Sequence, residues 1–234
     1  APFLDNGWRI FAFEPNHQSR AKLLERLAKH KNKSLVALDT RGVSNKSPKG
    51  VFSSTSQESS GISGRSAFHE SDVETTPVDT TTLTAFFEDK PLPGVDFLKT
   101  DTDGHDLFVL QGFPWDRGKP AVIECKFEDS KTVPLGYTFH DMARFLYDKG
   151  YTVYVSEWHP ITRHGIRHDW RHLIRYPCEL VDSKGWGSLL AFREPIDEKV
   201  LIAAVRKVLK VGVIEGNPRG TGDTTKALAP LAKP

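Results

Sequence analysis

The sequence predicts an α/β protein built around a mostly parallel sheet. An apolar run at 9–13 is followed by helical spacing of Ala and Leu over 17–31 and by a second apolar run at 34–38. Strand–helix–strand is the unit of parallel sheets, because a crossover of this length brings the second strand beside the first. A length of 234 residues with a hydrophobic fraction of 38% suits one such domain with its own core.

The rest of the chain predicts further elements of the same kind. Strands are expected at 51–53, 73–78, 95–100, 121–126, 151–155 and 186–192. Helices are expected at 82–87, 139–149 and 197–210, and a further one runs through Leu107 and Leu110. Residues 44–72 are rich in Ser and Gly and predict a long loop around the first of these strands. We therefore expect one domain over 1–194, followed by an amphipathic helix and a loose basic tail over 195–234.

Composition argues against several classes of protein. The net charge of +2 comes from the tail, so the folded part lacks the basic face of a nucleic-acid binder. No run approaches the roughly 18 apolar residues that span a bilayer. Cys125 and Cys178 have no partner at motif spacing, which favours a reduced, cytoplasmic chain. The start at Ala1 is neither an initiator Met nor a signal peptide, so we expect part of a longer polypeptide.

Glu14 is the first candidate site residue, at the carboxyl end of the strand at 9–13. In doubly wound sheets, an acid at this place accepts hydrogen bonds from the hydroxyls of a bound ribose. Alternatively, Glu14 only complements the dipole of the following helix. Its position alone leaves both interpretations open.

Titratable side chains also follow the strand at 95–100, where Asp101, Asp103 and His105 surround a glycine that permits an unusual turn. Ligands in open α/β sheets bind beyond the carboxyl ends of strands, so this segment is a candidate catalytic edge. The alternative is that Asp103 or Asp106 caps the following helix.

Glu124 lies inside an apolar strand, where a carboxylate is costly unless it is paired or faces a site. Together with Asp101 it could hold a hard divalent ion such as magnesium. The alternatives are that the two acids share a proton or pair with an arginine.

The segment 157–185 is a long excursion between two predicted strands. If it is helical, its basic residues form one stripe and its histidines another, namely Arg163, Arg167, Arg171, Arg175, His164, His168 and His172. We expect a solvated lid; the alternatives are an anion-binding rim for an acidic acceptor and a zinc site. Aromatic residues nearby are expected to pack rather than to stack on a sugar, namely Trp158, Trp170 and Trp186.

Several blocks resemble, in order, the FkbM-like family of S-adenosylmethionine-dependent methyltransferases. They are FAFEPN (11–16), GVS (42–44), VDFLKTDTDGHDLFVLQG (95–112), AVIE (121–124) and WGSLLAF (186–192). The resemblance covers about residues 3–193. Its most specific part, LKTDTDGHDLFVLQG, is similar to the family pattern Lys-Ile-Asp-x-Glu-Gly-His-Glu-x-x-x-Leu-x-Gly.

This resemblance implies a Rossmann-like methyltransferase fold, a mostly parallel twisted sheet whose last strand is antiparallel. It also implies S-adenosyl-L-methionine as cofactor and O-methylation of a hydroxyl on a small-molecule, glycan or natural-product acceptor. The expected cofactor-binding residues are Glu14, Asn16, Asp39 and Asp101. The expected catalytic residues are Asp101, Asp103 and His105, with His105 orienting or deprotonating the acceptor.

The chain departs from the family pattern in two ways. Asp103 and Asp106 stand where the family has Glu, and each is one methylene shorter. The strand and glycine-rich loop expected before Pro2 do not occur, which would leave neighbouring strands with open edges. Two competing hypotheses are therefore a non-catalytic binding module of the same fold and a nicotinamide-dependent oxidoreductase, which also needs an acid at Glu14.

Overall fold

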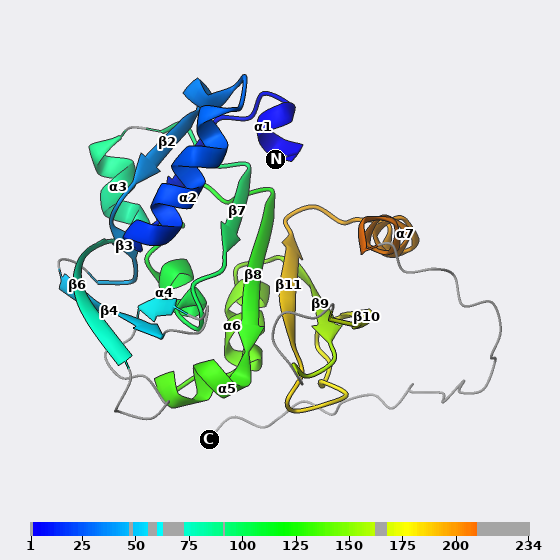
Figure 1. Ribbon diagram of the computed structural model, residues 1–234. Helices are drawn as coiled ribbons and strands as arrows, with labels where there is room; N and C mark the ends of the chain where they lie inside the picture. The colour runs from blue at the N-terminus through cyan, green and yellow to red at the C-terminus, as the bar shows by residue number, and fades with distance from the viewer. Residues whose placement is uncertain are drawn as a thin grey trace, which may run out of the picture. The chain divides into compact units, whose positions relative to one another are not determined.

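The computed structural model describes residues 2–46, 49–55, 60–62, 73–90, 92–161 and 168–209. The chain divides into two compact units, Ala1–Asp197 and Glu198–Pro234. The first unit carries the strands (Figure 1). In the second unit, the structure describes helix α7 (Glu198–Leu209), close to the predicted span of 197–210. No helix of the described residues is both long and apolar enough to cross a membrane.

The predicted strand–helix–strand unit is present at the start of the chain. Strand β1 (Ile10–Phe13) pairs in parallel with β2 (Val36–Asp39), and α2 (His17–Ala28) connects them. A short helix α1 (Pro2–Asp5) precedes β1, and a 3₁₀ turn at Lys33–Leu35 leads into β2. The carboxyl ends of the two strands coincide, because Phe13 is in register with Asp39.

A five-stranded sheet lies at the centre of the first unit, in the order β10-β9-β11-β8-β7. Its strands are β7 (Phe97–Thr100), β8 (Val122–Glu128), β9 (Thr152–Trp158), β10 (Trp170–Arg175) and β11 (Trp186–Phe192). Strands β7 and β8 are parallel, whereas β11 lies between β8 and β9 and is antiparallel to both. In Figure 1 the arrows of β2 and β7 point down and that of β11 points up.

The prediction of an antiparallel last strand is confirmed, but that of a mostly parallel sheet is wrong. Strand β10 is antiparallel to β9, so only β7 and β8 form a parallel pair within the five-stranded sheet. The sheet is mixed because the excursion and the last strand return by direct connections, which put antiparallel neighbours side by side.

The excursion at 157–185 contains a strand, whereas the stripes of arginines and histidines require a helix. Residues Trp170–Arg175 form β10, so the helical hypothesis is wrong for this part, and Arg163, His164 and Arg167 lie outside the described residues. The strand forms because 170–175 is aromatic and apolar enough to pair with β9, with Leu173 opposite Ser156. The four-residue spacing of the charged residues therefore does not indicate a helix over Trp170–Arg175.

Two strands of a third sheet, β4 (Lys49–Thr55) and β5 (Ser60–Ile62), occupy part of the loop predicted at 44–72. The other strands of this sheet are β3 (Gly42–Val43) and β6 (Val73–Thr81), and the order is β3-β6-β4-β5. The predicted strand at 51–53 is thus the middle of a longer one. The loop prediction also covered 47–48, 56–59 and 63–72, which lie outside the described residues.

Helices cover one face of the five-stranded sheet. Helix α6 (Phe139–Asp148) packs its buried Met142 and Leu146 against alternate residues of β8 and β11, such as Ile123 and Leu189. Between β8 and α6 lie a short helix α5 (Asp129–Thr132) and a 3₁₀ turn (Val133–Leu135). Because side chains alternate along a strand, the residues between these core positions point to the opposite face.

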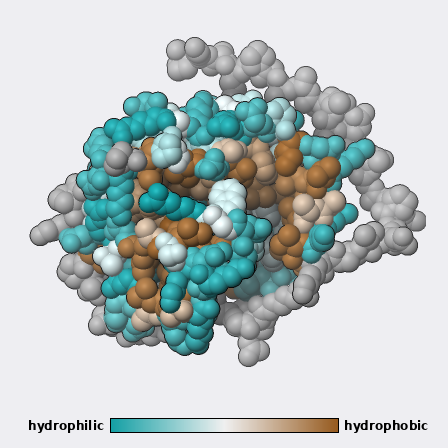
Figure 2. Space-filling model, turned by 90° about the horizontal axis from the view of Figure 1, so that it is seen from above, coloured by the Kyte–Doolittle hydropathy of each residue, from teal (hydrophilic) through white to brown (hydrophobic). Residues whose placement is uncertain are grey.

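Strands β1 and β7 share a core without sharing a hydrogen-bonded ladder. Helices α3 (Leu83–Asp89) and α4 (Asp106–Gln111) form a second apolar cluster, against which Phe11, Phe13 and Leu98 pack. Within the described part of the chain, β1 pairs only with β2 and β7 only with β8. Figure 2 shows apolar side chains gathered in the middle of the surface seen from above.

Candidate active site

The turn after β7 is held by a buried carboxylate at its far end. Asp106 is fully buried, and its Oδ2 accepts hydrogen bonds from the backbone N–H of Thr102 (3.2 Å) and from the Thr102 hydroxyl (2.8 Å). Its Oδ1 accepts one from the backbone N–H of Lys126 (3.3 Å). Burial raises the pKa of Asp106. Asp106 therefore fastens the turn to β8.

The helix-capping interpretation of the two aspartates is wrong. The N-cap position of α4 is His105, and no side chain makes the cap hydrogen bond there. Asp103 instead sits in the left-handed region with φ of 51°, next to Gly104 with φ of 101°. The unusual turn predicted from the glycine is thus present, and it directs Asp103 toward α5.

Tyr137 stabilises this turn through two hydrogen bonds. Its hydroxyl donates a hydrogen bond to the carbonyl of Gly104 (2.6 Å) and accepts one from the backbone N–H of Leu107 (3.4 Å). Burial is the main cause that raises the pKa of Tyr137. The phenol therefore acts as a neutral bridge between the turn and the first residues of α4.

A network of charges lies at the carboxyl ends of β7 and β8. The Lys126 ammonium is 3.4 Å from Asp101 Oδ1 and 3.9 Å from Asp103 Oδ1. Lys131 is 3.0 Å from Asp103 Oδ1 and 3.0 Å from Glu128 Oε2. The Asp101 side chain is 55% exposed, whereas that of Asp103 is 23% exposed, so Asp101 is the more accessible of the two predicted acids.

His105 lies beside these acids in an apolar environment. Its ring is 4.7 Å from that of Phe108, and burial lowers the pKa of His105 to about 4. Its Nδ1 is buried with no hydrogen-bond partner among the described residues. The imidazole is therefore neutral near pH 7 and can accept a hydrogen bond, which suits orientation of a bound polar group better than strong general-base catalysis.

We expect acid to destabilise the protein through His105. The unfolded chain binds a proton at His105 near pH 6.5, but the folded chain does so only near pH 4, so stability is lost as pH falls between these values. The loss is on the order of 3 kcal/mol. Urea unfolding at pH 7 and pH 5 measures how much the free energy of unfolding changes with pH. This change should be smaller in His105→Gln than in wild type, whereas the surface variant His17→Gln should behave like wild type. Equal changes in all three proteins would refute the prediction.

Glu14 directly follows β1 and lies beside the end of β2, because its backbone N–H donates to the Asp39 carbonyl (3.0 Å). Its Oε1 accepts a hydrogen bond from the backbone N–H of Asn16 (2.8 Å), and burial raises the pKa of Glu14. The Asn16 side chain caps α2 by accepting from the N–H groups of Gln18 (2.9 Å) and Ser19 (3.0 Å). The local role of Asn16 is therefore structural.

Asp39 has a strong partner of its own. Arg41 donates to it from Nε (3.0 Å to Oδ1) and from Nη2 (2.8 Å to Oδ2), and its backbone N–H also donates to Oδ1 (2.9 Å). The Arg41 guanidinium lowers the pKa of Asp39. To contact a cofactor, the Asp39 carboxylate therefore has to break its ion pair with Arg41 or accept hydrogen bonds from both partners at once.

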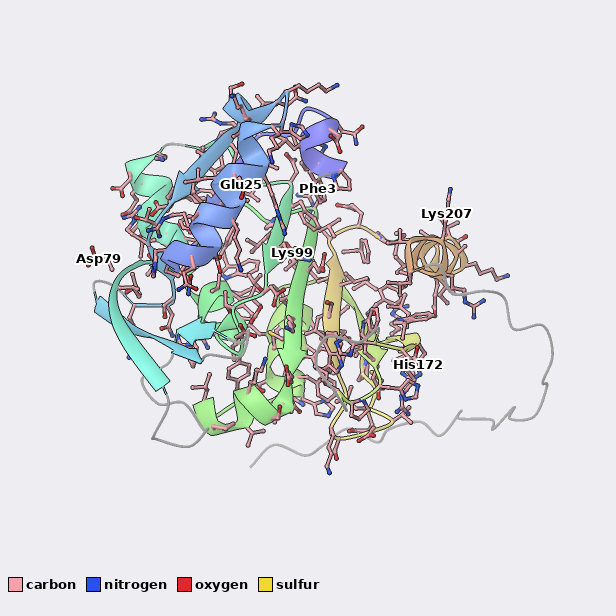
Figure 3. All side chains as sticks on the ribbon, viewed as in Figure 1. Phe3, Glu25, Asp79, Lys99, His172 and Lys207 are labelled. Atoms are coloured by element: carbon pink, nitrogen blue, oxygen red, sulfur yellow. The ribbon has the colours of Figure 1, made fainter. Side chains whose placement is uncertain are left out.

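The alternative pair for a metal ion has separate partners. Glu124 Oε1 is 2.7 Å from the ammonium of Lys99, which lies opposite it on β7 and is labelled in Figure 3. Asp101 pairs instead with Lys126. No group of three or more possible metal ligands occurs among the described residues. Magnesium binding by Asp101 and Glu124 stays an untested prediction.

The structure thus forms two groups from the predicted site residues. Glu14, Asn16 and Asp39 lie at the ends of β1 and β2, and Asp101, Asp103 and His105 follow the end of β7. The sequence-based prediction missed several partners, namely Arg41, Lys126, Glu128, Lys131 and Tyr137. Lys126 could have been found, since it is two residues after Glu124 and so lies on the same face of β8.

These features define a mixed α/β protein whose candidate site lies at the carboxyl ends of parallel strand pairs. The family model of the Methyltransferase FkbM domain matches residues 2–153 of the 234, a span that includes every predicted catalytic and cofactor-binding residue. The chain belongs to the FkbM family of methyltransferase domains, as its motifs indicated. No curated protein and no solved structure matches the chain.

Proposed function

We propose that this domain transfers a methyl group from S-adenosyl-L-methionine to a hydroxyl of a sugar, a glycan or a natural product. Family membership supports methyl transfer. The observation that carries the proposal further is that Glu14 follows β1 and Asp101 follows β7, each at the carboxyl end of a parallel pair. Open α/β sheets bind nucleotide cofactors at such ends. That the domain has a Rossmann-like fold is part of what we propose.

The residues present fit this cofactor. Glu14 is half-buried and oriented by the Asn16 N–H, so its carboxylate can accept hydrogen bonds from both hydroxyls of a ribose. When bound, S-adenosylmethionine supplies a methyl group on a positively charged sulfur, which becomes a neutral thioether on transfer. The carboxylate of Asp101 complements such a positive charge.

The protein's second task is to align the acceptor hydroxyl and remove its proton. The half-buried, neutral imidazole of His105 can accept a hydrogen bond from this hydroxyl and fix the direction of attack. Asp101, at 55% exposure, is the carboxylate of the same turn that can take up this proton. We assign orientation to His105, with Asp101 and Asp103 as its acidic neighbours.

Cofactor binding is tested with Glu14→Ala. The variant is expected to bind S-adenosylmethionine at least about tenfold more weakly, because hydrogen bonds to a charged group contribute roughly 1.5–3 kcal/mol each. Isothermal titration calorimetry measures the affinity. The control is Glu25→Ala, since Glu25 is an exposed glutamate on α2 of the same unit (Figure 3). Undiminished affinity in Glu14→Ala would remove the ribose role.

A non-catalytic binding module of the same fold is the second candidate. It is favoured by the observation that β1 and β7 share no ladder with a common strand among the described residues. Transfer of a tritiated methyl group to a panel of sugars and glycans separates the two functions, with His105→Ala as the comparison.

A cytoplasmic location is part of the proposal, and the two free cysteines support it.

A further inference from the structure

The Lys126 side chain is fixed from several sides at the edge of the candidate site. Its ammonium lies 3.4 Å from Asp101 Oδ1 on one side and 5.7 Å from the centre of the Trp186 ring on another. Trp186 is itself held, because its indole N–H donates to the carbonyl of His159 (3.0 Å) and its ring stacks on Trp158 at 5.5 Å. Lys126 is therefore an oriented charge, with its side chain 25% exposed.

The backbone of Lys126 is tied to the same turn as its side chain. Its N–H donates to Asp106 Oδ1 (3.3 Å), and Asp106 in turn holds Thr102 at the start of the turn. The backbone of Lys126 thus keeps a defined position relative to the turn that carries Asp101. A flexible surface lysine would lack this second connection.

The charges around the turn do not cancel. Asp101, Asp103 and Glu128 supply three carboxylates, and Lys126 and Lys131 supply two ammonium groups. The network therefore carries one net negative charge when all five groups are ionised. Without Lys126 it would carry two, and the added negative charge would be centred next to Asp101.

We propose that Lys126 is a positioning residue that holds Asp101 and limits the negative potential where the methyl donor's sulfur lies. This inference rests on the proposed function, because it requires a sulfonium near Asp101. Lys126 reduces the preference of the site for the cationic donor over its neutral thioether product. A smaller preference avoids overstabilising the cationic ground state relative to the transition state, in which the sulfur has already lost part of its charge.

The test compares affinities for S-adenosylmethionine and S-adenosylhomocysteine, measured by calorimetry at low salt. In Lys126→Met, the ratio of the two affinities should shift toward S-adenosylmethionine by on the order of threefold to tenfold, as expected for one partly screened charge. Lys126→Arg should restore the wild-type ratio. Lys119→Met is the matched control, because Lys119 precedes β8 at its other end and donates to the Lys149 carbonyl.

Damage to the fold would weaken both ligands together and leave their ratio unchanged, so the ratio isolates the effect of charge. An unchanged ratio in Lys126→Met, with both ligands bound, overturns the inference and leaves Lys126 a solvated ion pair. A shift of the same size in Lys119→Met also overturns it. If folded wild-type protein binds neither ligand, the proposed function itself fails, and the inference falls with it.

Discussion

Glu157→Ala is expected to lower the free energy of unfolding by about 3–5 kcal/mol, because it removes a fully buried charge from its partners. The Glu157 carboxylate accepts hydrogen bonds from the backbone N–H groups of Val181 (3.1 Å) and Asp182 (3.2 Å). It is also 3.1 Å from His172 Nε2 and 3.5 Å from Arg171 Nε. Figure 3 shows His172 on the β10 side of the sheet, away from Lys99.

The carboxylate thus joins β9, β10 and the segment before β11. Its loss would leave the backbone N–H groups of Val181 and Asp182 without their acceptor and would remove the closer of the two ion pairs of Arg171. Urea unfolding followed by circular dichroism measures the effect. Glu124→Ala is the control, because Glu124 forms a partly exposed pair with Lys99 and should change stability by about 1 kcal/mol or less. Equal losses in the two variants would contradict the structural role of Glu157.

Gly187→Ala is expected to cost about 3 kcal/mol or more, or to prevent folding, because no space exists for a β-carbon at this position. A Cβ atom added there would lie 1.8 Å from the carbonyl oxygen of Ser156 and 3.1 Å from the Phe127 ring. Gly187 belongs to β11, opposite Glu157 of β9 and Phe127 of β8. The clash is with backbone, so β9 and β11 would have to separate.

The matched control is Ser188→Ala, one residue further along β11. Its side chain is half-buried on the opposite face of the sheet, and we expect a change within about 0.5–1 kcal/mol. Far-ultraviolet circular dichroism and thermal unfolding compare the two variants. Gly187→Ala with wild-type stability would show that β9 and β11 are not as closely paired as the structure has them.

Elements whose signals are local were predictable from the sequence. The unit at 10–39, helix α6 and strand β11 follow from hydrophobic periodicity over neighbouring residues, and their spans agree to within a few residues. Strand β10 was not predictable in this way, because its charged residues repeat every four positions. Its conformation is decided by pairing with β9 and by the buried Glu157 on the neighbouring strand.

The site shows the same division. The sequence placed Asp101, Asp103 and His105 in one turn after a strand, because residues close in the chain stay close in space. It could not supply Lys126 and Lys131 as their partners, since these lysines lie more than twenty residues away along the chain. It also could not show that Asp39 is held by Arg41.

The sequence by itself thus determined the family, the starting α/β unit and the acids and histidine that follow strand ends. Only the tertiary structure decided the mixed direction of the sheet, the strand within the excursion and the partner of each candidate side chain. The physical reason is range: periodicity and turn chemistry act over a few residues, whereas strand pairing and ion pairs depend on which distant segments pack together.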